Sequence, residues 1–316
     1  MEDQKNHSFI SNSNLRKFLV RAVIFFFPVV IGYAMVEYTL SEINFAEKVR
    51  YNYIQENSDE IEILFLGSSQ IERAINPKFI AAGAINLANS SQTLFEDFKL
   101  LKFFNPKLPK LKLVVLEISY DKLERDKSNI LPILDPKNLK FYGVNTFGRK
   151  LKLQDHLLFH FSPKYFSKIL NEYIFKTSNI KLNKFGFDEN KFDGAYSHAN
   201  YVLIENIHNK KNYKKNLLLL NEIISYCNEN NLKIFIYHPP THYRYNELRD
   251  PSLVKKWRKL IDSLKYQYPK IHFFIDDTNS TFTRKYFDDA NHLNPLGAEK
   301  ATKTLDSILQ KYYPNL

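Results

Sequence analysis

Residues Ile63 to Pro77 have the sequence ILFLGSSQIERAINP, in which a strand-like run meets two serines. Four apolar residues end at Gly67 and are followed by Ser68 and Ser69. A short apolar run that stops at a turn residue is typical of a buried β-strand. Such a strand displays the side chain that follows it, so each serine is either a candidate nucleophile or an ordinary turn residue.

The alternation of apolar strand and amphipathic helix continues along the chain. Strands are predicted at 61–67, 83–91, 111–119, 232–240 and 270–277, and helices at 92–104, 213–231, 251–268 and 294–313. Strands that alternate with helices imply an α/β fold, here a three-layer α/β/α sandwich with a mainly parallel sheet. Functional groups gather at the carboxyl ends of such strands, which is where Ser69 falls.

Residues of about 120–210 break this alternation. They are rich in lysine, asparagine and aromatic residues, and their clearest helix is PKYFSKILNEYIF, 163–175. We interpret them as an insertion in an α/β domain of residues 61–316, placed so that it covers or borders the site.

The N-terminal part predicts a membrane anchor. Residues 1–17 are polar, and the apolar run 18–40 is interrupted only by Arg21 and Glu37. With its flanks this run is long enough for one transmembrane helix. A cleaved signal peptide is the alternative, but no clear cleavage site follows. Basic residues before the run favour a cytoplasmic N-terminus, which puts the juxtamembrane segment 41–60 and the α/β domain outside the cytoplasm, in the periplasm of a Gram-negative cell.

The composition and net charge of the chain limit the kinds of function that it can have. The 316 residues are 44% hydrophobic and 25% charged, as in a globular domain. The net charge of +11 suits anionic partners such as a membrane surface or an acidic polymer, whereas no nucleic-acid-binding motif is present. The single cysteine, Cys227, excludes an intramolecular disulfide and lacks companions for a metal site. No cofactor and no metal are expected.

A serine nucleophile needs a histidine base, and an acid usually orients that histidine. The stretch YFDDANHLNPLGAEK, 286–300, carries Asp289 and His292 three positions apart. This spacing lets a carboxylate fold back onto its own histidine through a turn, which fixes one tautomer of the imidazole. Asp288 is a competing acid, but the spacing favours Asp289.

FLGSSQ, NLANSSQ and DANHLNPLGA together resemble the ordered blocks of the SGNH (GDSL-type) hydrolase superfamily. The resemblance implies a Ser69–His292–Asp289 catalytic triad. It also implies that the backbone N–H of Ala88, which stands where the second block usually has glycine, donates to the oxyanion.

The third block departs from the family pattern. LEISYDKLE, 116–124, contains no asparagine to serve as an oxyanion donor. Either Tyr120 or a backbone N–H takes that role, or the oxyanion hole is incomplete. His238, at the end of the fourth predicted strand, is expected to line the pocket. A zinc site with His242 is disfavoured because two prolines between them prevent a helix.

The tethered domain also looks like the bacterial branch related to alginate O-acetylation proteins and to D-alanyl-transfer proteins of teichoic acid. This resemblance implies a membrane-tethered, extracytoplasmic serine acyltransferase or acylesterase that acts on O-acyl groups of a cell-surface polysaccharide. Its partners would be that glycan, membrane lipid and a multi-spanning membrane O-acyltransferase. The alternative is a non-catalytic assembly or scaffold partner of such an acyltransferase, which the missing asparagine favours. An intracellular, membrane-anchored esterase is a third, weaker hypothesis.

Overall fold

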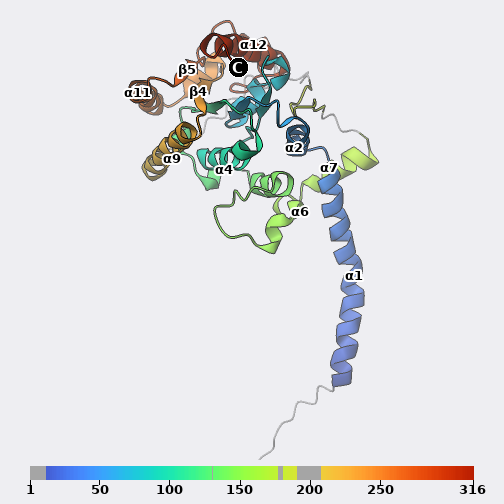
Figure 1. Cartoon of the computed structure of the whole chain (residues 1–316). Coiled ribbons are helices and arrows are strands. Elements are labelled where there is room, and N and C mark those ends of the chain that lie inside the picture. Colours follow the sequence, from blue (N-terminus) through green and yellow to red (C-terminus); the bar gives the residue numbers. More distant parts are fainter. Residues whose placement is uncertain (1–11, 130, 177–180, 191–207) are drawn as a thin grey trace, which may run out of the picture. The chain divides into compact units, whose positions relative to one another are not determined.

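The computed structural model describes residues 12–129, 131–176, 181–190 and 208–316 (Figure 1). The chain divides into two compact units. The smaller unit joins Met1–Ile43 with Leu157–Ser178, and the larger unit joins Asn44–His156 with Asn179–Leu316. The division therefore falls after Ile43, whereas the sequence pattern placed the start of the α/β domain at residue 61.

The larger unit is built on a five-stranded sheet with the order β2-β1-β3-β4-β5. Every neighbouring pair is parallel, so the predicted parallel sheet is confirmed. The strands are β1 (Ile63–Leu66), β2 (Ala84–Asn86), β3 (Leu113–Glu117), β4 (Lys233–His238) and β5 (His272–Ile275).

Helices cover both faces of this sheet (Figure 1). Alternate residues of a strand point to opposite faces, and β1 shows the consequence. Leu64 and Leu66 pack in one apolar cluster, while Ile63 and Phe65 pack in the other. The first cluster includes α4 (Leu94–Phe104), α9 (Lys210–Glu229) and α11 (Pro251–Gln267); the second includes α3 (Ser69–Ala74) and α12 (Pro295–Tyr312). The three-layer α/β/α architecture is confirmed.

Local sequence signals fix where the long helices begin. Thr93 and Glu96 form a reciprocal capping box at the start of α4. The side chain of Asn294 accepts a hydrogen bond from the Gly297 N–H and caps α12, with Pro295 in the first turn. The N-cap of α12 therefore lies two residues after His292, and the helix begins one residue later.

Residues 41–60 were predicted to form a polar juxtamembrane segment, but α2 (Ala46–Asn57) belongs to the larger unit. Glu47, Arg50 and Ile54 of α2 are buried. Arg50 donates to the Ala88 carbonyl at 2.9 Å, so α2 braces the loop that follows β2.

The smaller unit contains α1 (Asn12–Glu42), α6 (Leu158–Phe161), α7 (Tyr165–Ile169) and the π-helical turn η7 (Leu170–Ile174). The last two confirm the helix predicted at 163–175. Among the described residues, one helix is long and apolar enough to cross a membrane: Asn14–Glu42, with a mean hydropathy of 2.2. Its 29 residues span roughly 44 Å, more than the ~30 Å hydrocarbon core of a bilayer. A signal sequence near the N-terminus meets the same criteria.

The remaining elements are short and connect these layers. They are η1 (Pro77–Phe79), η2 (Asn105–Lys107), η3 (Lys122–Glu124), η4 (Lys127–Asn129), α5 (Leu134–Lys137), η5 (Asn138–Tyr142), η6 (Leu153–His156), α10 (Tyr243–Leu248) and η8 (Arg284–Tyr286).

Candidate active site

Ser68 and Ser69 have different surroundings at the end of β1. Ser68 is the N-cap of α3, and its hydroxyl oxygen accepts a long hydrogen bond of 3.4 Å from the Gln70 N–H. Ser68 also donates through both its N–H and its hydroxyl to the Glu117 carboxylate. Ser69 is the first residue of α3 and is half-buried. The Ser68 hydroxyl is therefore bound to the Glu117 carboxylate, which leaves Ser69 as the candidate nucleophile.

The three predicted triad side chains converge. His292 Nε2 lies 2.7 Å from Ser69 Oγ, and His292 Nδ1 lies 2.8 Å from Asp289 Oδ2. The other carboxylate oxygen of Asp289 accepts from the backbone N–H groups of Asn291 and His292, both at 2.9 Å. The carboxylate is therefore anchored by its own turn, and the imidazole is held between acid and hydroxyl.

A narrow turn before α12 holds His292 in place. Phe287 and Leu293 form an antiparallel bridge, and the Asp288 N–H donates to the His292 carbonyl at 2.9 Å. The Asn294 side chain donates to the Lys285 carbonyl at 2.8 Å. Asp289, rather than the competing Asp288, has its carboxylate on the imidazole.

The charge on Asp289 determines which nitrogen of His292 carries the proton. Burial raises the pKa of the Asp289 carboxyl, but its hydrogen bond to His292, the charge of that histidine and the two backbone N–H groups outweigh burial, so the pKa is lowered. The ionised carboxylate favours the tautomer with the proton on Nδ1. His292 Nε2 is then the acceptor for the proton of Ser69.

Ser69 borders a small polar cavity of about 80 Å³. This volume is well below the ~300–1,000 Å³ of pockets for drug-sized ligands. The lining comes from the turn after β1, the loop after β2, the segment after β3 and the catalytic turn: Ser68, Ser69, Gln70, Ser91, Gln92, Ser119, Asp121, Lys122, Arg125, Tyr245 and Asn291. The first residues of the predicted insertion therefore do border the site.

Glu117, the last residue of β3, is a site residue that the sequence analysis did not single out. It is fully buried. Burial raises the pKa of its carboxyl, but Lys122 and the hydrogen bonds from Ser68 outweigh burial and lower it. The one available signal was a charged residue that ends an otherwise apolar strand.

Lys122 balances this buried charge. Its side chain is 1% exposed, and Nζ lies 3.1 Å from Asp97 Oδ2 and donates to the Gln92 carbonyl at 2.9 Å. Burial alone would lower the pKa of Lys122, but the Asp97 and Glu117 carboxylates raise it. Glu117, Lys122 and Asp97 thus form a buried charged network, and its Glu117 carboxylate binds the turn that contains Ser68.

Two of the predicted oxyanion donors lie elsewhere. The Ala88 N–H donates to Asn86 Oδ1 at 3.0 Å, because the Asn86 side chain folds back between β2 and α3. Tyr120 packs against Tyr245 in the cluster around α4, α9 and α11, and burial raises the pKa of its hydroxyl to about 12. Neither residue lines the cavity beside Ser69, so the structure contradicts both predicted roles.

His238 also lies away from the cavity. It is fully buried, its Nδ1 lies 2.9 Å from the Pro239 carbonyl, and its ring packs on Trp257 at 5.2 Å. The alternation of β4 directs His238 toward α11 rather than toward Ser69. The prediction that it lines this pocket is wrong. Within the described residues, no cluster of three or more His, Cys, Asp or Glu side chains could hold a metal ion.

Ser91 and Gln92 are the residues of the second block that line the cavity. The φ of Ser91, 62°, lies in the left-handed region, which a non-glycine residue seldom adopts unless its surroundings impose it. The sequence analysis did not single out Ser91, because the residue type alone does not show which way a side chain in a loop points.

The fold and the site together define a class of α/β protein with a serine–histidine–aspartate group at one edge of a parallel sheet. No protein-family model matches the chain, and a comparison with curated proteins finds no match.

Among solved structures, the chain is similar to a GDSL-like lipase from Bacteroides thetaiotaomicron VPI-5482. The identity is 14%, with 85% of this chain and 99% of the other covered and a TM-score of 0.41. It is also similar to an acylhydrolase-type protein from Bacteroides fragilis NCTC 9343, at 13% identity, 86% and 100% coverage and a TM-score of 0.41. A family two carbohydrate esterase from Clostridium thermocellum follows, at 12% identity, 81% and 65% coverage and a TM-score of 0.34. At these low values, the argument for an activity rests on the geometry of the site itself.

Proposed function

We propose that this chain is a serine-dependent ester hydrolase or O-acyltransferase. The observation that carries the proposal is the 2.7 Å contact between His292 Nε2 and Ser69 Oγ, with Asp289 on the other imidazole nitrogen. A base within hydrogen-bond reach of a hydroxyl, itself oriented by an acid, is the arrangement that activates a serine.

The reaction follows from these contacts. His292 Nε2 takes the Ser69 proton as Oγ attacks the acyl carbonyl, and the same proton passes to the departing alcohol as the ester bond breaks. The acyl group is then bonded to Ser69. Water or a sugar hydroxyl gives a proton to His292, attacks the acyl carbon and releases it, and Ser69 recovers its proton from His292.

Oxyanion stabilisation must come from groups on the cavity wall. The backbone N–H of Ser69 and the polar groups of Ser91 and Asn291 are the candidates, since all three residues line the cavity. These replace the Ala88 and Tyr120 donors expected from the sequence. The small volume beside Ser69 favours a short acyl group over a long chain.

The finer proposal concerns location and substrate. Because the chain has a membrane-length apolar helix and resembles the tethered O-acylation branch, we propose that the helix is an uncleaved anchor with a cytoplasmic N-terminus. The α/β unit would then act outside the cytoplasm on O-acyl groups of a cell-surface polysaccharide, with a multi-spanning acyltransferase as its partner. A reporter fused after residue 316 tests this topology.

Hydrolysis of p-nitrophenyl acetate and p-nitrophenyl octanoate by the full chain in detergent tests the activity. Ser69→Ala should lower the rate with the acetate ester by more than ~10³-fold, and the octanoate ester should be the poorer substrate. Ser307→Ala, an exposed serine on α12, is the matched control and should leave the rate unchanged. Equal rates for wild type and Ser69→Ala would remove the catalytic proposal.

A non-catalytic scaffold is the second candidate function, favoured by the absence of an asparagine in the segment after β3. It predicts that Ser69→Ala has no effect on ester hydrolysis. It also predicts that the variant still supports polysaccharide acylation in a strain that lacks the native gene.

A further inference from the structure

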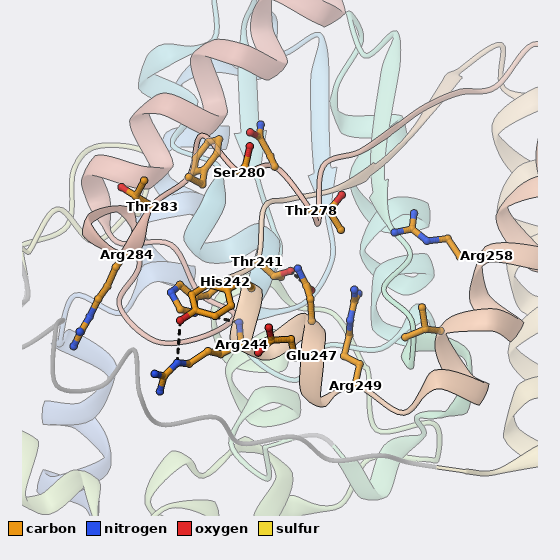
Figure 2. A pocket seen from close by; sticks show the side chains of 15 residues that line it. Thr241, His242, Arg244, Glu247, Arg249, Arg258, Thr278, Ser280, Thr283 and Arg284 are labelled. Carbon is orange, nitrogen blue, oxygen red and sulfur yellow. Dashed lines mark hydrogen bonds between the residues drawn. The ribbon is translucent and has the colours of Figure 1, made fainter.

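A second, larger cavity of about 890 Å³ lies among the segments that follow β4 and β5 (Figure 2). Its lining residues include Arg244, Arg249, Arg258 and Arg284. Its volume falls in the ~300–1,000 Å³ range of small-molecule sites. Ser69 and His292 do not line it, so it is distinct from the acyl cavity.

The arginines leave an excess of positive charge at this cavity. Asp277, which is buried beneath it, pairs with Arg249 at 3.0 Å and with Arg258 at 2.8 Å, and one carboxylate cannot neutralise two guanidinium groups. Figure 2 shows Arg244 and Arg284 extending on the same side of the cavity. Glu247 is the one acidic residue of the lining.

His242 lies close enough to Arg244 and Arg284 for their charges to act on its imidazole. Burial is the main cause that lowers the pKa of this imidazole, and the two arginine charges lower it further, while the Glu247 charge raises it by less.

The rest of the lining suits a sugar. Thr278, Ser280 and Thr283 are exposed and present hydroxyl groups that both donate and accept hydrogen bonds. Tyr243, which lines the same cavity, has 58% of its surface exposed and supplies an aromatic ring. Hydroxyl partners and an aromatic face next to arginines match a ring that carries both hydroxyls and an anionic group.

The cavity wall is joined to the catalytic turn. The His242 N–H donates to the Ala290 carbonyl at 2.9 Å, and the His242 ring contacts Phe287 at 5.5 Å between ring centres. Ala290 is two residues before His292. His242 therefore links the wall of this cavity to the turn that positions the base.

We propose that this arginine-lined cavity binds an anionic saccharide, one that carries carboxylate or phosphate groups, and anchors the polymer whose acyl groups reach Ser69. Planar guanidinium groups recognise both anions through paired hydrogen bonds. The role in turnover rests on the proposed function, whereas the binding itself does not.

Binding is measured by calorimetry on the full chain carrying Ser69→Ala, so that no turnover intervenes and loss of activity cannot be confused with loss of binding. The probes are a galacturonate hexamer, glucose 6-phosphate, neutral maltohexaose and inorganic phosphate. The single tryptophan, Trp257, lies 4.4 Å from the Arg258 guanidinium and gives a second, fluorescent readout.

We expect at least one charged sugar to bind ten times more tightly than maltohexaose and inorganic phosphate. Arg244→Gln with Arg284→Gln should weaken that binding at least tenfold; Arg249 and Arg258 are kept because they pair with buried Asp277. Lys265→Gln with Lys311→Gln, both exposed, removes the same charge elsewhere and should change the Kd less than twofold. The proposal would be overturned if neither charged sugar bound more tightly than maltohexaose, if inorganic phosphate bound as tightly as the charged sugars, or if both double variants had an equal effect. Thermal unfolding of each variant confirms that it is folded.

Discussion

His292 Nε2 lies 2.7 Å from Ser69 Oγ although 223 positions separate the two residues in the sequence. The contact exists because Ser69 starts α3 and His292 precedes α12, and these two helices cover the same face of the sheet. Packing of α3 against α12 thus determines whether the base reaches the hydroxyl. The testable consequences concern the acid, the buried charges, a pH-dependent carboxyl and a glycine.

Asp289→Asn should lower kcat for p-nitrophenyl acetate by on the order of 10³–10⁴, because the amide no longer stabilises the charged imidazole or fixes its tautomer. Asp288→Asn is the matched control and should retain most of the activity, since Asp289 carries the contact with Nδ1. A kcat within tenfold of wild type for Asp289→Asn would contradict the orienting role.

Glu117→Gln should destabilise the larger unit by roughly 3–5 kcal/mol, because it leaves the Lys122 charge buried with one partner fewer. Lys122→Met should destabilise the unit by a comparable amount, because it leaves the Glu117 carboxylate buried without the Lys122 charge. The double variant should be less destabilised than the two single costs added together, since it removes both charges. Urea unfolding of all four proteins measures this coupling, and strict additivity would show that Glu117 and Lys122 do not interact.

Asp276 should make stability fall as the pH rises. Burial and the neighbouring Asp277 charge raise the pKa of its carboxyl from 3.8 to about 6, although Asn279 donates a hydrogen bond to it. The folded state therefore favours the neutral acid, and the penalty for ionisation develops between about pH 4 and pH 6 and is complete above it.

Asp276→Asn should then stabilise the protein by about 1 kcal/mol at pH 8, a value reduced from the full shift because the group is partly exposed, and by almost nothing at pH 4. Asp262→Asn, on the exposed side of α11, is the comparison. A gain that is the same at both pH values would rule out ionisation as its cause.

Gly67→Ala should cost roughly 1–3 kcal/mol of stability and reduce activity. A Cβ at this position would come within 2.7 Å of the Glu117 carboxylate and 2.8 Å of Ile71 Cγ1, so β3 or α3 must shift. Gly32→Ala, where nothing lies within 4 Å, serves as the control. Thermal unfolding and ester hydrolysis are measured on both variants; a fully active, equally stable Gly67→Ala protein would show that the close approach does not matter.

The sequence was sufficient where the signal is local. Short apolar runs such as Ile63–Leu66 predict strands, and the amphipathic segments that follow them predict helices. Both patterns are visible in the sequence because burial of an element gives its apolar residues a characteristic spacing. The pairing of Asp289 with His292 was predictable for the same reason, since three residues of turn bring the carboxylate to the imidazole. Asn294 and Pro295 mark the start of α12 through capping chemistry that needs no distant contact.

The directions of side chains and the contacts between segments far apart in the chain were not predictable from the sequence. Tyr120 and His238 lie near the carboxyl ends of strands, as Ser69 does, but both pack in the layer that contains α11. The N–H of Ala88 is taken by Asn86. Glu117 and Lys122 have a role only because Ser68 and Asp97 come from other elements.

By itself, the sequence determined the layers, the order of the elements and the residues able to act as nucleophile, base and acid, because strand and helix periods and short turns are written in neighbouring residues. The tertiary structure alone decided which side chains face Ser69, which charges are buried beneath it and that four arginines from separate helices and loops meet at one cavity. Those outcomes depend on packing between segments far apart in the chain, which no local pattern encodes.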